Sequence, residues 1–232
     1  MLLLAMLCLS LLSCSGAKPS SSGGSSNLCA DFANKTRNHF GRDKAQFCDS
    51  RNGKRYVYVE IGGKKWMAEN LNYNAPGSKC GDGRSLSDEN TATCDTYGRL
   101  YNWTTAMANV CPSGWHIPNG TDWNVLMKFV VPSCSDNSNC DGAGTKLKAT
   151  SGWNTGSGYI AGTDDYGFSA LPGGYGYSDG YLYDAGNYGL WWSSSEDHSN
   201  LAYRRIMGYD DEYAYWGNYD KSALFSVRCL QD

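Results

Sequence analysis

The clearest pattern of hydrophobic and polar positions surrounds a pair of glycines. In YVYVEI, which starts at Tyr56, aliphatic side chains occupy every second position, as in a strand with one buried face. Gly62 and Gly63 follow directly, and two glycines readily supply the positive φ angles of a tight hairpin turn. KKWMAENL then returns, so residues 56–71 are predicted to form a β-hairpin.

Helical spacing is found in two places after this hairpin. YNWTTAMANV, residues 101–110, predicts a short helix. A longer helix is expected to begin at Thr121, whose hydroxyl can cap the first turn, with Asp122 near its positive end. Pro132 ends the pattern. The apolar positions of this helix are Trp123, Leu126, Met127 and Val130.

Residues 151–220 show little helical periodicity and are crowded with Gly, Tyr, Trp, Ser, Asn and Asp. Short apolar segments in and after this region predict short strands separated by long loops. They are FSALP (168–172), LWWSS (190–194), AYRRIM (202–207) and LFSVRCL (224–230). Helices do not alternate with strands as they do around a parallel sheet, so the predicted fold class is α+β.

The N-terminus predicts export. The apolar run from Leu2 to Leu12 is too short to span a bilayer of about 30 Å and fits a secretory signal. It leads into LLSC, which resembles the lipobox of bacterial lipoproteins and implies cleavage before Cys14 and acylation of its thiol. The Ser/Gly-rich sequence that follows is typical of a flexible tether. Four parts are therefore expected: a signal peptide (1–13), a tether (14–27), an N-terminal extension with a cysteine pair (28–55) and a domain (56–232).

The net charge limits the classes of partner that are expected. The chain has 20 Lys and Arg against 23 Asp and Glu, a net charge of −3, and no basic cluster. This composition does not favour nucleic acid or an anionic membrane surface, so membrane contact is expected through the lipid anchor only.

The cysteines predict disulfides. Of ten cysteines, Cys8 lies in the signal and Cys14 at the lipid site, which leaves eight. An even number in an exported chain indicates paired thiols. Zinc sites need close pairs such as C-x2-C, and the tightest spacing here is Cys134 to Cys140. No metal site is predicted.

Several separated motifs occur in a fixed order: DSRNGKRYVYVEIGGKKWMAENLNY, YGRLYNW, CPSGWHIP, GFSALPGGY, WWSSSE and FSVRC. Together they resemble the Fibrobacter succinogenes major paralogous domain, from about Asp49 to Leu230. Proteins of that family are typically exported bacterial lipoproteins whose biochemical role is largely undefined. The domain is similar to the C-type lectin-like fold shared with the formylglycine-generating enzyme superfamily.

The resemblance implies a C-type lectin-like domain with a small antiparallel sheet, two flanking helices, long disulfide-linked loops, and residues 224–230 as the returning strand. In that fold, a disulfide from Cys111 to Cys229 would join the helical region to the last strand, worth about 4–5 kcal/mol by loop closure. The other pairs are expected from closeness along the chain: Cys80–Cys94, Cys134–Cys140 and Cys29–Cys48.

The motif CPSGWHIP raises the question of catalysis, because Cys111 precedes His116 by five residues. A thiol–imidazole dyad needs a free thiolate, an oriented base and an oxyanion site, and the expected disulfide removes the thiol. The oxidase chemistry of the distant superfamily does not carry over, because no cysteine falls in a matching motif. No catalytic residue or cofactor is predicted, and the chain is not expected to be an enzyme.

Calcium-dependent sugar binding in lectin-like domains rests on Glu-Pro-Asn or Gln-Pro-Asp with Trp-Asn-Asp, and these tripeptides are absent from the sequence. The acidic clusters at 164–165 and 210–212 offer oxygen ligands without a spaced pattern. They are expected to be solvated loop charges.

Aromatic side chains crowd residues 175–219, among Gly, Asp and Asn. Tyr beside Gly, Ser and Asn is typical of recognition loops, where sugar rings can stack. The alternative is that these aromatics pack a helix-poor core, and about half of them are expected there. Trp191 and Trp192 are expected to point to opposite sides of a strand, one inward and one outward. The candidate ligand contacts are Tyr177, Tyr181, Tyr183, Trp192, Tyr213 and Trp216.

These observations favour an exported, lipid-anchored, non-enzymatic binding or adhesion module of the cell envelope, at the outer membrane or cell surface. Polysaccharide or another envelope protein is the expected partner. Two alternatives stay open: an enzyme derived from the formylglycine-generating superfamily, which would need a free thiol, and a structural envelope protein.

Overall fold

The computed structural model describes residues 28–30, 36–80 and 91–232. The predicted signal peptide, the lipid site at Cys14 and the tether lie outside these residues. In the described part of the chain, no helix is both long enough and apolar enough to cross a lipid bilayer.

An antiparallel sheet is built around the predicted hairpin, which the structure confirms as β3 and β4 with Gly62 and Gly63 at positive φ. The strand order is β1-β2-β3-β4-β13-β6. Its strands are β1 (Thr36–His39), β2 (Arg42–Cys48), β3 (Arg55–Ile61), β4 (Lys64–Met67), β6 (Trp115–His116) and β13 (Leu230–Gln231). β1 and β2 come from the polar segment before residue 56; β1 pairs with β2, and β2 pairs with β3 in this same sheet.

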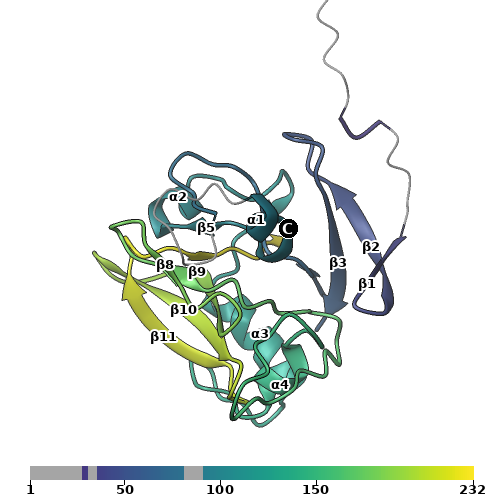
Figure 1. Ribbon diagram of the computed structural model, residues 1–232, viewed down its shortest axis with the longest axis vertical. Helices are drawn as coiled ribbons and strands as arrows, with labels where there is room; N and C mark the ends of the chain where they lie inside the picture. The colour runs from purple at the N-terminus through teal and green to yellow at the C-terminus, as the bar shows by residue number, and fades with distance from the viewer. Residues whose placement is uncertain (1–27, 31–35, 81–90) are drawn as a thin grey trace, which may run out of the picture.

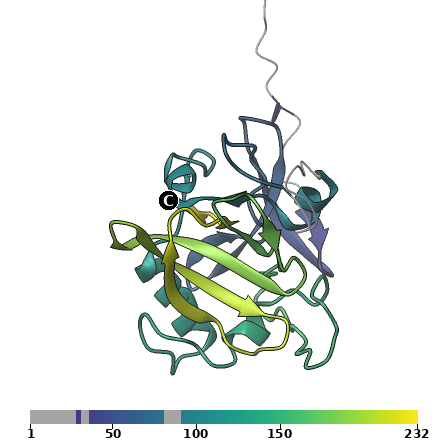
Figure 2. The ribbon, with the colours of Figure 1, turned by 60° about the vertical axis from the view of Figure 1, so that its left-hand side comes forward.

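The second sheet has five strands in the order β11-β10-β9-β12-β5. In Figure 2, β9, β10 and the yellow β11 lie side by side across the front. The strands are β5 (Leu100–Tyr101), β9 (Tyr188–His198), β10 (Leu201–Gly208), β11 (Tyr215–Asp220) and β12 (Phe225–Ser226), and a separate two-stranded hairpin consists of β7 (Tyr175–Gly176) and β8 (Leu182–Tyr183). LWWSS and AYRRIM are thus confirmed as strands, whereas LFSVRCL divides into β12 and β13.

The expectation of an α+β fold with a small sheet and two flanking helices is wrong. Among the described residues, sheets of six and five strands form most of the architecture, and only one helix exceeds two turns. The helices are α1 (Thr91–Tyr97), α2 (Trp103–Met107), α3 (Gly120–Val130) and α4 (Ala143–Leu147). The aromatic-rich region expected to be mostly loop instead contributes β9, the longest strand at 11 residues, together with β10 and β11.

Helix α3 begins two residues earlier than expected. Asn119, rather than Thr121, is the N-cap: its side chain accepts a hydrogen bond from the backbone N–H of Asp122, and the Asp122 carboxylate accepts one from the backbone N–H of Asn119. This reciprocal capping box satisfies two donors that the first turn leaves free. The helix ends at Val130, two residues before Pro132, as the apolar pattern predicted.

Helix α3 lies between the two sheets, and Figure 1 shows it between β3 and β10. One hydrophobic cluster joins its buried face to the first sheet and to Trp191, and a second joins Trp192 to Phe225 and Tyr101. Both tryptophans are fully buried. The expected inward and outward split is therefore wrong, because β9 is packed on both faces, and Trp192 is a core residue that cannot contact a ligand.

Four disulfides join Cys29 to Cys48, Cys80 to Cys94, Cys111 to Cys229, and Cys134 to Cys140. These are the pairs expected from the sequence and the family resemblance. The Cys111–Cys229 bond spans 118 residues and lies within the hydrophobic cluster that contains Trp192.

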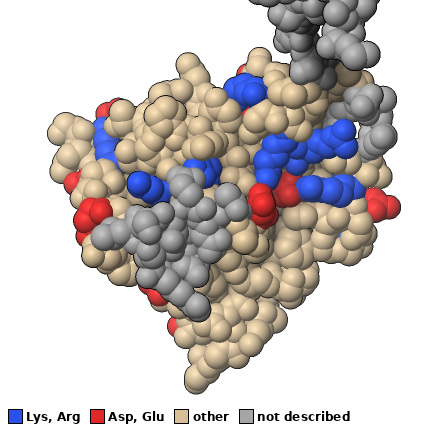
Figure 3. All heavy atoms as spheres, turned by 45° about the horizontal axis from the view of Figure 1, so that its top comes forward, with Lys and Arg blue, Asp and Glu red and all other residues tan. Residues whose placement is uncertain are grey.

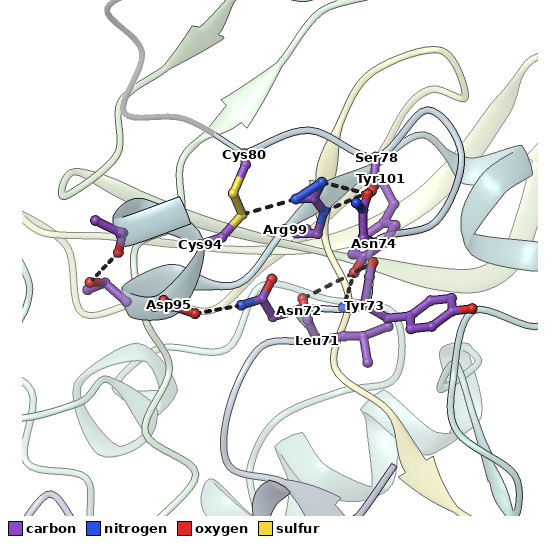
Figure 4. Close-up of a disulfide and its surroundings, with 12 residues drawn as sticks. Leu71, Asn72, Tyr73, Asn74, Ser78, Cys80, Cys94, Asp95, Arg99 and Tyr101 are labelled. Atoms are coloured by element: carbon purple, nitrogen blue, oxygen red, sulfur yellow. Dashed lines mark hydrogen bonds between the residues drawn. A yellow bond between two sulfur atoms is a disulfide. The ribbon is translucent and has the colours of Figure 1, made fainter. Parts of the chain in front are cut away.

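Side chains organise the irregular segment around residues 71–80, as Figure 4 shows. The Arg99 guanidinium donates hydrogen bonds to Asn74 and Ser78, and it lies beside the Cys80–Cys94 disulfide. The Tyr101 hydroxyl accepts from the backbone N–H of Tyr73 and donates to its carbonyl oxygen. Arg99 and Tyr101 therefore hold this segment in place, together with a single reciprocal backbone pairing between Lys79 and Leu100 of β5.

Candidate functional site

The β7–β8 hairpin carries four tyrosines on one face. Tyr175 pairs with Tyr183 across the hairpin, and Tyr177 and Tyr181 continue the same face, while Leu182 packs on the other face against Leu100 and Leu224. Tyr177, Tyr181 and Tyr183 are 37–45% exposed, unusually high values for large apolar side chains in this protein. The pattern Y-G-Y-S-D-G-Y-L-Y thus places its leucine inward and its tyrosines toward solvent.

Beside this hairpin is a hollow of about 460 Å³, here called the tyrosine pocket. Leu190 of β9 and Ile206 of β10 are directly paired across the sheet and form its floor with Phe225. Its walls come from several segments: Tyr175 and Tyr177 from the hairpin, Asp184 from the loop after β8, Tyr188 from the start of β9, and Tyr219 from β11.

Among the described residues that line the pocket, Arg204 is the one cation. Its guanidinium lies 4.7 Å from the centre of the Tyr219 ring and 5.6 Å from that of Phe225, and it donates a hydrogen bond to the carbonyl oxygen of Asn218. Burial lowers the pKa of Arg204 from its ordinary value. The positive charge inside the pocket is thus already matched to aromatic faces.

The tyrosine hydroxyls form a connected polar rim. Burial raises the pKa of Tyr175, as do hydrogen bonds to Tyr177 and Asp184. The pKa of Tyr219 is raised first by its hydrogen bond to Tyr177 and then by burial. The rim therefore consists of neutral hydroxyls and one carboxylate, which can donate to and accept from a ligand's hydroxyl groups.

The structure brings three of the six candidate ligand contacts, Tyr177, Tyr181 and Tyr183, to this hairpin. Trp216 lies on the opposite face of β11, where its ring stacks on Tyr203 with centroids 4.9 Å apart. Tyr213 stacks on Tyr215 just before and at the start of β11.

Several pocket residues were missed as candidate contacts. Tyr175, Asp184, Tyr188, Arg204 and Tyr219 come from four separate segments, and no single stretch of sequence shows that they meet. The alternating tyrosines of the hairpin were the available pattern, since period two places them on one face.

Two other hollows are weaker candidates for a functional site, because their charged or reactive side chains already have partners. One of about 720 Å³ contains Arg37, Lys54, Glu69 and Asp95, but Lys54 lies 3.4 Å from Asp95 and Arg37 pairs with Glu69. Figure 3 likewise shows Lys and Arg beside Asp and Glu on one face of the molecule. The opposing charges neutralise each other there.

The other hollow lies along the CPSGWHIP motif. Cys111 is bonded to Cys229, and Nδ1 of His116 is 2.5 Å from Oδ1 of Asp232, with Asp122 on its other nitrogen. His116 therefore has carboxylate partners rather than a thiol.

The acidic clusters do not gather into a cation site within the described part of the chain, where no group of three or more potential metal ligands occurs. Asp164, expected to be a solvated loop charge, is instead buried: its carboxylate accepts from the backbone N–H and the hydroxyl of Ser169, and it lies 3.8 Å from Lys44 Nζ. Asp211 bonds the Tyr213 N–H and the Tyr215 hydroxyl.

Residues 59–231 match the sequence model of the Fibrobacter succinogenes major domain, which covers both sheets except β1, β2 and the start of β3. The chain belongs to this family. No curated protein and no solved structure matches the chain. All elements that line the tyrosine pocket lie inside the family domain, so the pocket is built on the domain itself rather than on its N-terminal extension.

Proposed function

We propose that this family member is an exported, lipid-anchored, non-enzymatic binding protein of the cell envelope, and that its tyrosine pocket takes up neutral carbohydrate. The observation that carries the proposal is a hollow walled by four tyrosines held on or beside paired strands, namely Tyr175, Tyr177, Tyr188 and Tyr219. Tyrosines fixed in this way offer rigid, amphipathic contact area at low entropic cost.

The polar groups of the pocket suit sugar hydroxyls. The connected hydroxyls of Tyr175, Tyr177 and Tyr219 and the Asp184 carboxylate lie around an apolar floor. A pyranose ring has apolar C–H faces and hydroxyls around its edge, so floor and rim match its two kinds of surface.

The charges favour a neutral ligand. The Arg204 guanidinium already lies against the Tyr219 and Phe225 rings inside the pocket, which disfavours binding of a second cation there. Asp184 lies in the pocket, and Asp179 is close enough to contribute to the raised pKa of Tyr183, so an anionic ligand would meet like charge.

A binding role is favoured over hydrolysis. Among the described residues that line the pocket, Asp184 is the only carboxylate, whereas glycoside hydrolysis generally needs a pair of carboxylates.

The experiment is isothermal titration calorimetry of the full, oxidised chain with neutral hexasaccharides of glucose, xylose and mannose. At least one is expected to bind, and Tyr177→Ala is expected to weaken that binding tenfold or more, because a central aromatic contact is lost. Tyr177→Phe, which keeps the ring, is expected to lose less.

The matched control is Tyr166→Ala, since Tyr166 is a half-buried tyrosine that packs on Phe129 outside the pocket. It is expected to bind like the unmodified protein. Absence of binding to all three sugars, or an equal loss in Tyr166→Ala, would contradict the proposal.

Export and anchoring are supported by the four disulfides, which persist in oxidising compartments, and by the N-terminal sequence. Cells fed radioactive fatty acid are expected to label the protein, and Cys14→Ala is expected to abolish the label. Unchanged labelling of that variant would exclude acylation at Cys14.

A further inference from the structure

The floor of the tyrosine pocket continues onto the edge strand of its sheet. Ile206 and Arg204 are the cross-strand partners of Tyr215 and Gly217 in β11. Because side chains alternate along a strand, Tyr215, Gly217 and Tyr219 share the pocket's face, with Trp216 on the other. One face of the sheet therefore carries both the pocket floor and Tyr215, which lies directly beside Ile206 of that floor.

A second aromatic platform lies beside the pocket floor, at the start of β11. The rings of Tyr213 and Tyr215 are stacked with centroids 5.4 Å apart and an interplanar angle of 24°. Asp211 fixes them by accepting from the backbone N–H of Tyr213 and from the hydroxyl of Tyr215. The platform is thus pre-organised, which lowers the entropic cost of binding.

Gly217 adds no side chain of its own to the surface between Tyr215 and Tyr219, where the Arg204 side chain lies. A Cβ at this position would touch Nη1 of Arg204 at 3.6 Å and no other atom within 4 Å, and its φ angle is not in the left-handed region. Neither backbone conformation nor crowding requires glycine here. Glycine weakens a strand and often marks a close approach by a ligand or another backbone.

The distance between the aromatic groups indicates the size of the occupant. Tyr215 and Tyr219 are four residues apart, or about 13 Å along an extended strand. A single sugar ring covers only part of that length. Asp211 beside the second aromatic platform, like Asp184 in the pocket, disfavours an acidic polymer.

We infer that the tyrosine pocket, Gly217 and the Tyr213–Tyr215 pair form one continuous groove that binds an extended, multi-residue stretch of a neutral polysaccharide. This inference rests on the proposed carbohydrate-binding function and specifies its ligand as a polymer segment rather than a single sugar or a chain end.

The test compares di- and hexasaccharides of glucose, xylose and mannose by calorimetry on the full chain. For a sugar that binds, the hexasaccharide is expected to bind at least tenfold more tightly than the disaccharide. Gly217→Val is expected to remove that advantage, measured as the ratio of the hexasaccharide affinity to the disaccharide affinity. Valine favours strands, so the variant is expected to remain folded, which its thermal unfolding midpoint checks.

Asn218→Val is the matched control, because residue 218 lies on the opposite face of the same strand. It is expected to keep the advantage of the longer chain. Equal affinity for both lengths, or no effect of Gly217→Val, would overturn the groove and leave the proposed function intact. Absence of binding at either length would overturn both, and binding of a proline-rich peptide in place of the sugars would overturn the ligand class.

Discussion

Loops that lack regular backbone pairing are held together by a buried cation. The Lys148 side chain is fully buried, and its ammonium donates to the carbonyl oxygens of Ile160, Gly208 and Asp211 at 2.8–2.9 Å. Burial lowers its pKa to about 8. One side chain thus links the loop after α4 to the end of β10 and to the turn before β11. Hydrogen bonds from a charged donor are stronger than those between neutral groups.

His39 is a partly buried polar group, and it predicts a pH dependence of stability. Its Nε2 lies 3.1 Å from the carbonyl oxygen of Ala68. Burial, followed by the charge of Lys44, lowers its pKa from 6.5 to about 4, and Arg37 and Arg228 act in the same direction. The unfolded imidazole therefore binds a proton at a higher pH than the folded one.

The free energy of unfolding is accordingly expected to fall as the pH drops from about 6.5 towards 4, and this contribution is fully present above pH 6.5. His39→Gln keeps a hydrogen-bond donor but cannot titrate, so the loss of stability between pH 7 and pH 4.5 is expected to be smaller. Urea unfolding at both pH values measures it. Exposed His198→Gln is the control, and an unchanged pH dependence in His39→Gln would contradict the assignment.

At the scale of elements, the β7–β8 hairpin depends on one glycine. Gly174 has φ 70°, and a Cβ there would lie 2.2 Å from the carbonyl oxygen of Tyr183. This close approach brings the start of β7 against the segment that carries Asp184, and so shapes the pocket wall.

Gly174→Ala is expected to displace the hairpin, to lower the free energy of unfolding by at least 2 kcal/mol (roughly the cost of strain plus the clash) and to abolish saccharide binding. Gly186→Ala is the control: Gly186 has φ 92° but open space around it, so it bears strain without a clash. Its cost is expected to be about 1 kcal/mol. Equal stability of the two variants would show that the close contact is unimportant.

Elements whose hydrophobic periodicity lies within one stretch could be predicted from the sequence, whereas elements whose structure depends on tertiary contacts could not. The hairpin at β3–β4 has alternation and a glycine turn in one stretch. FSALP has a strand-like composition but is not a strand, because Ser169 has φ 52° and is fixed by Asp164. Trp191 and Trp192 point to opposite faces as a strand requires, yet only tertiary packing determines that both faces are covered.

The candidate site was predicted in part for the same reason. The tyrosines of β7 and β8 form a local pattern, although each strand pairs over only two residues. Arg204 and Tyr219 join them through the sheet register of β10 and β11, which the sequence does not specify. Trp192 and Trp216 are residue types typical of binding loops, but Trp192 is buried in the core and Trp216 lies on the opposite face of β11.

For the whole molecule, the long-range disulfide is expected to dominate the stability contributed by crosslinks. Loop-closure entropy predicts about 5 kcal/mol for Cys111–Cys229, which spans 118 residues, and about 2 kcal/mol for Cys134–Cys140, which spans 6. Urea unfolding of the two double Cys→Ser variants measures the difference. A larger loss from the Cys134–Cys140 pair would contradict this ranking.

The segment from Phe225 to Gln231 contributes an inner strand to each sheet: β12 lies between β9 and β5, and β13 between β4 and β6. Protein synthesis and secretion deliver a chain from its N-terminus onward. Until this segment arrives, each sheet lacks an interior strand and Cys111 lacks its partner. Assembly of both large sheets is thus coupled to the arrival of this segment, so the domain is expected to stay unfolded until residues 225–231 are free to pair.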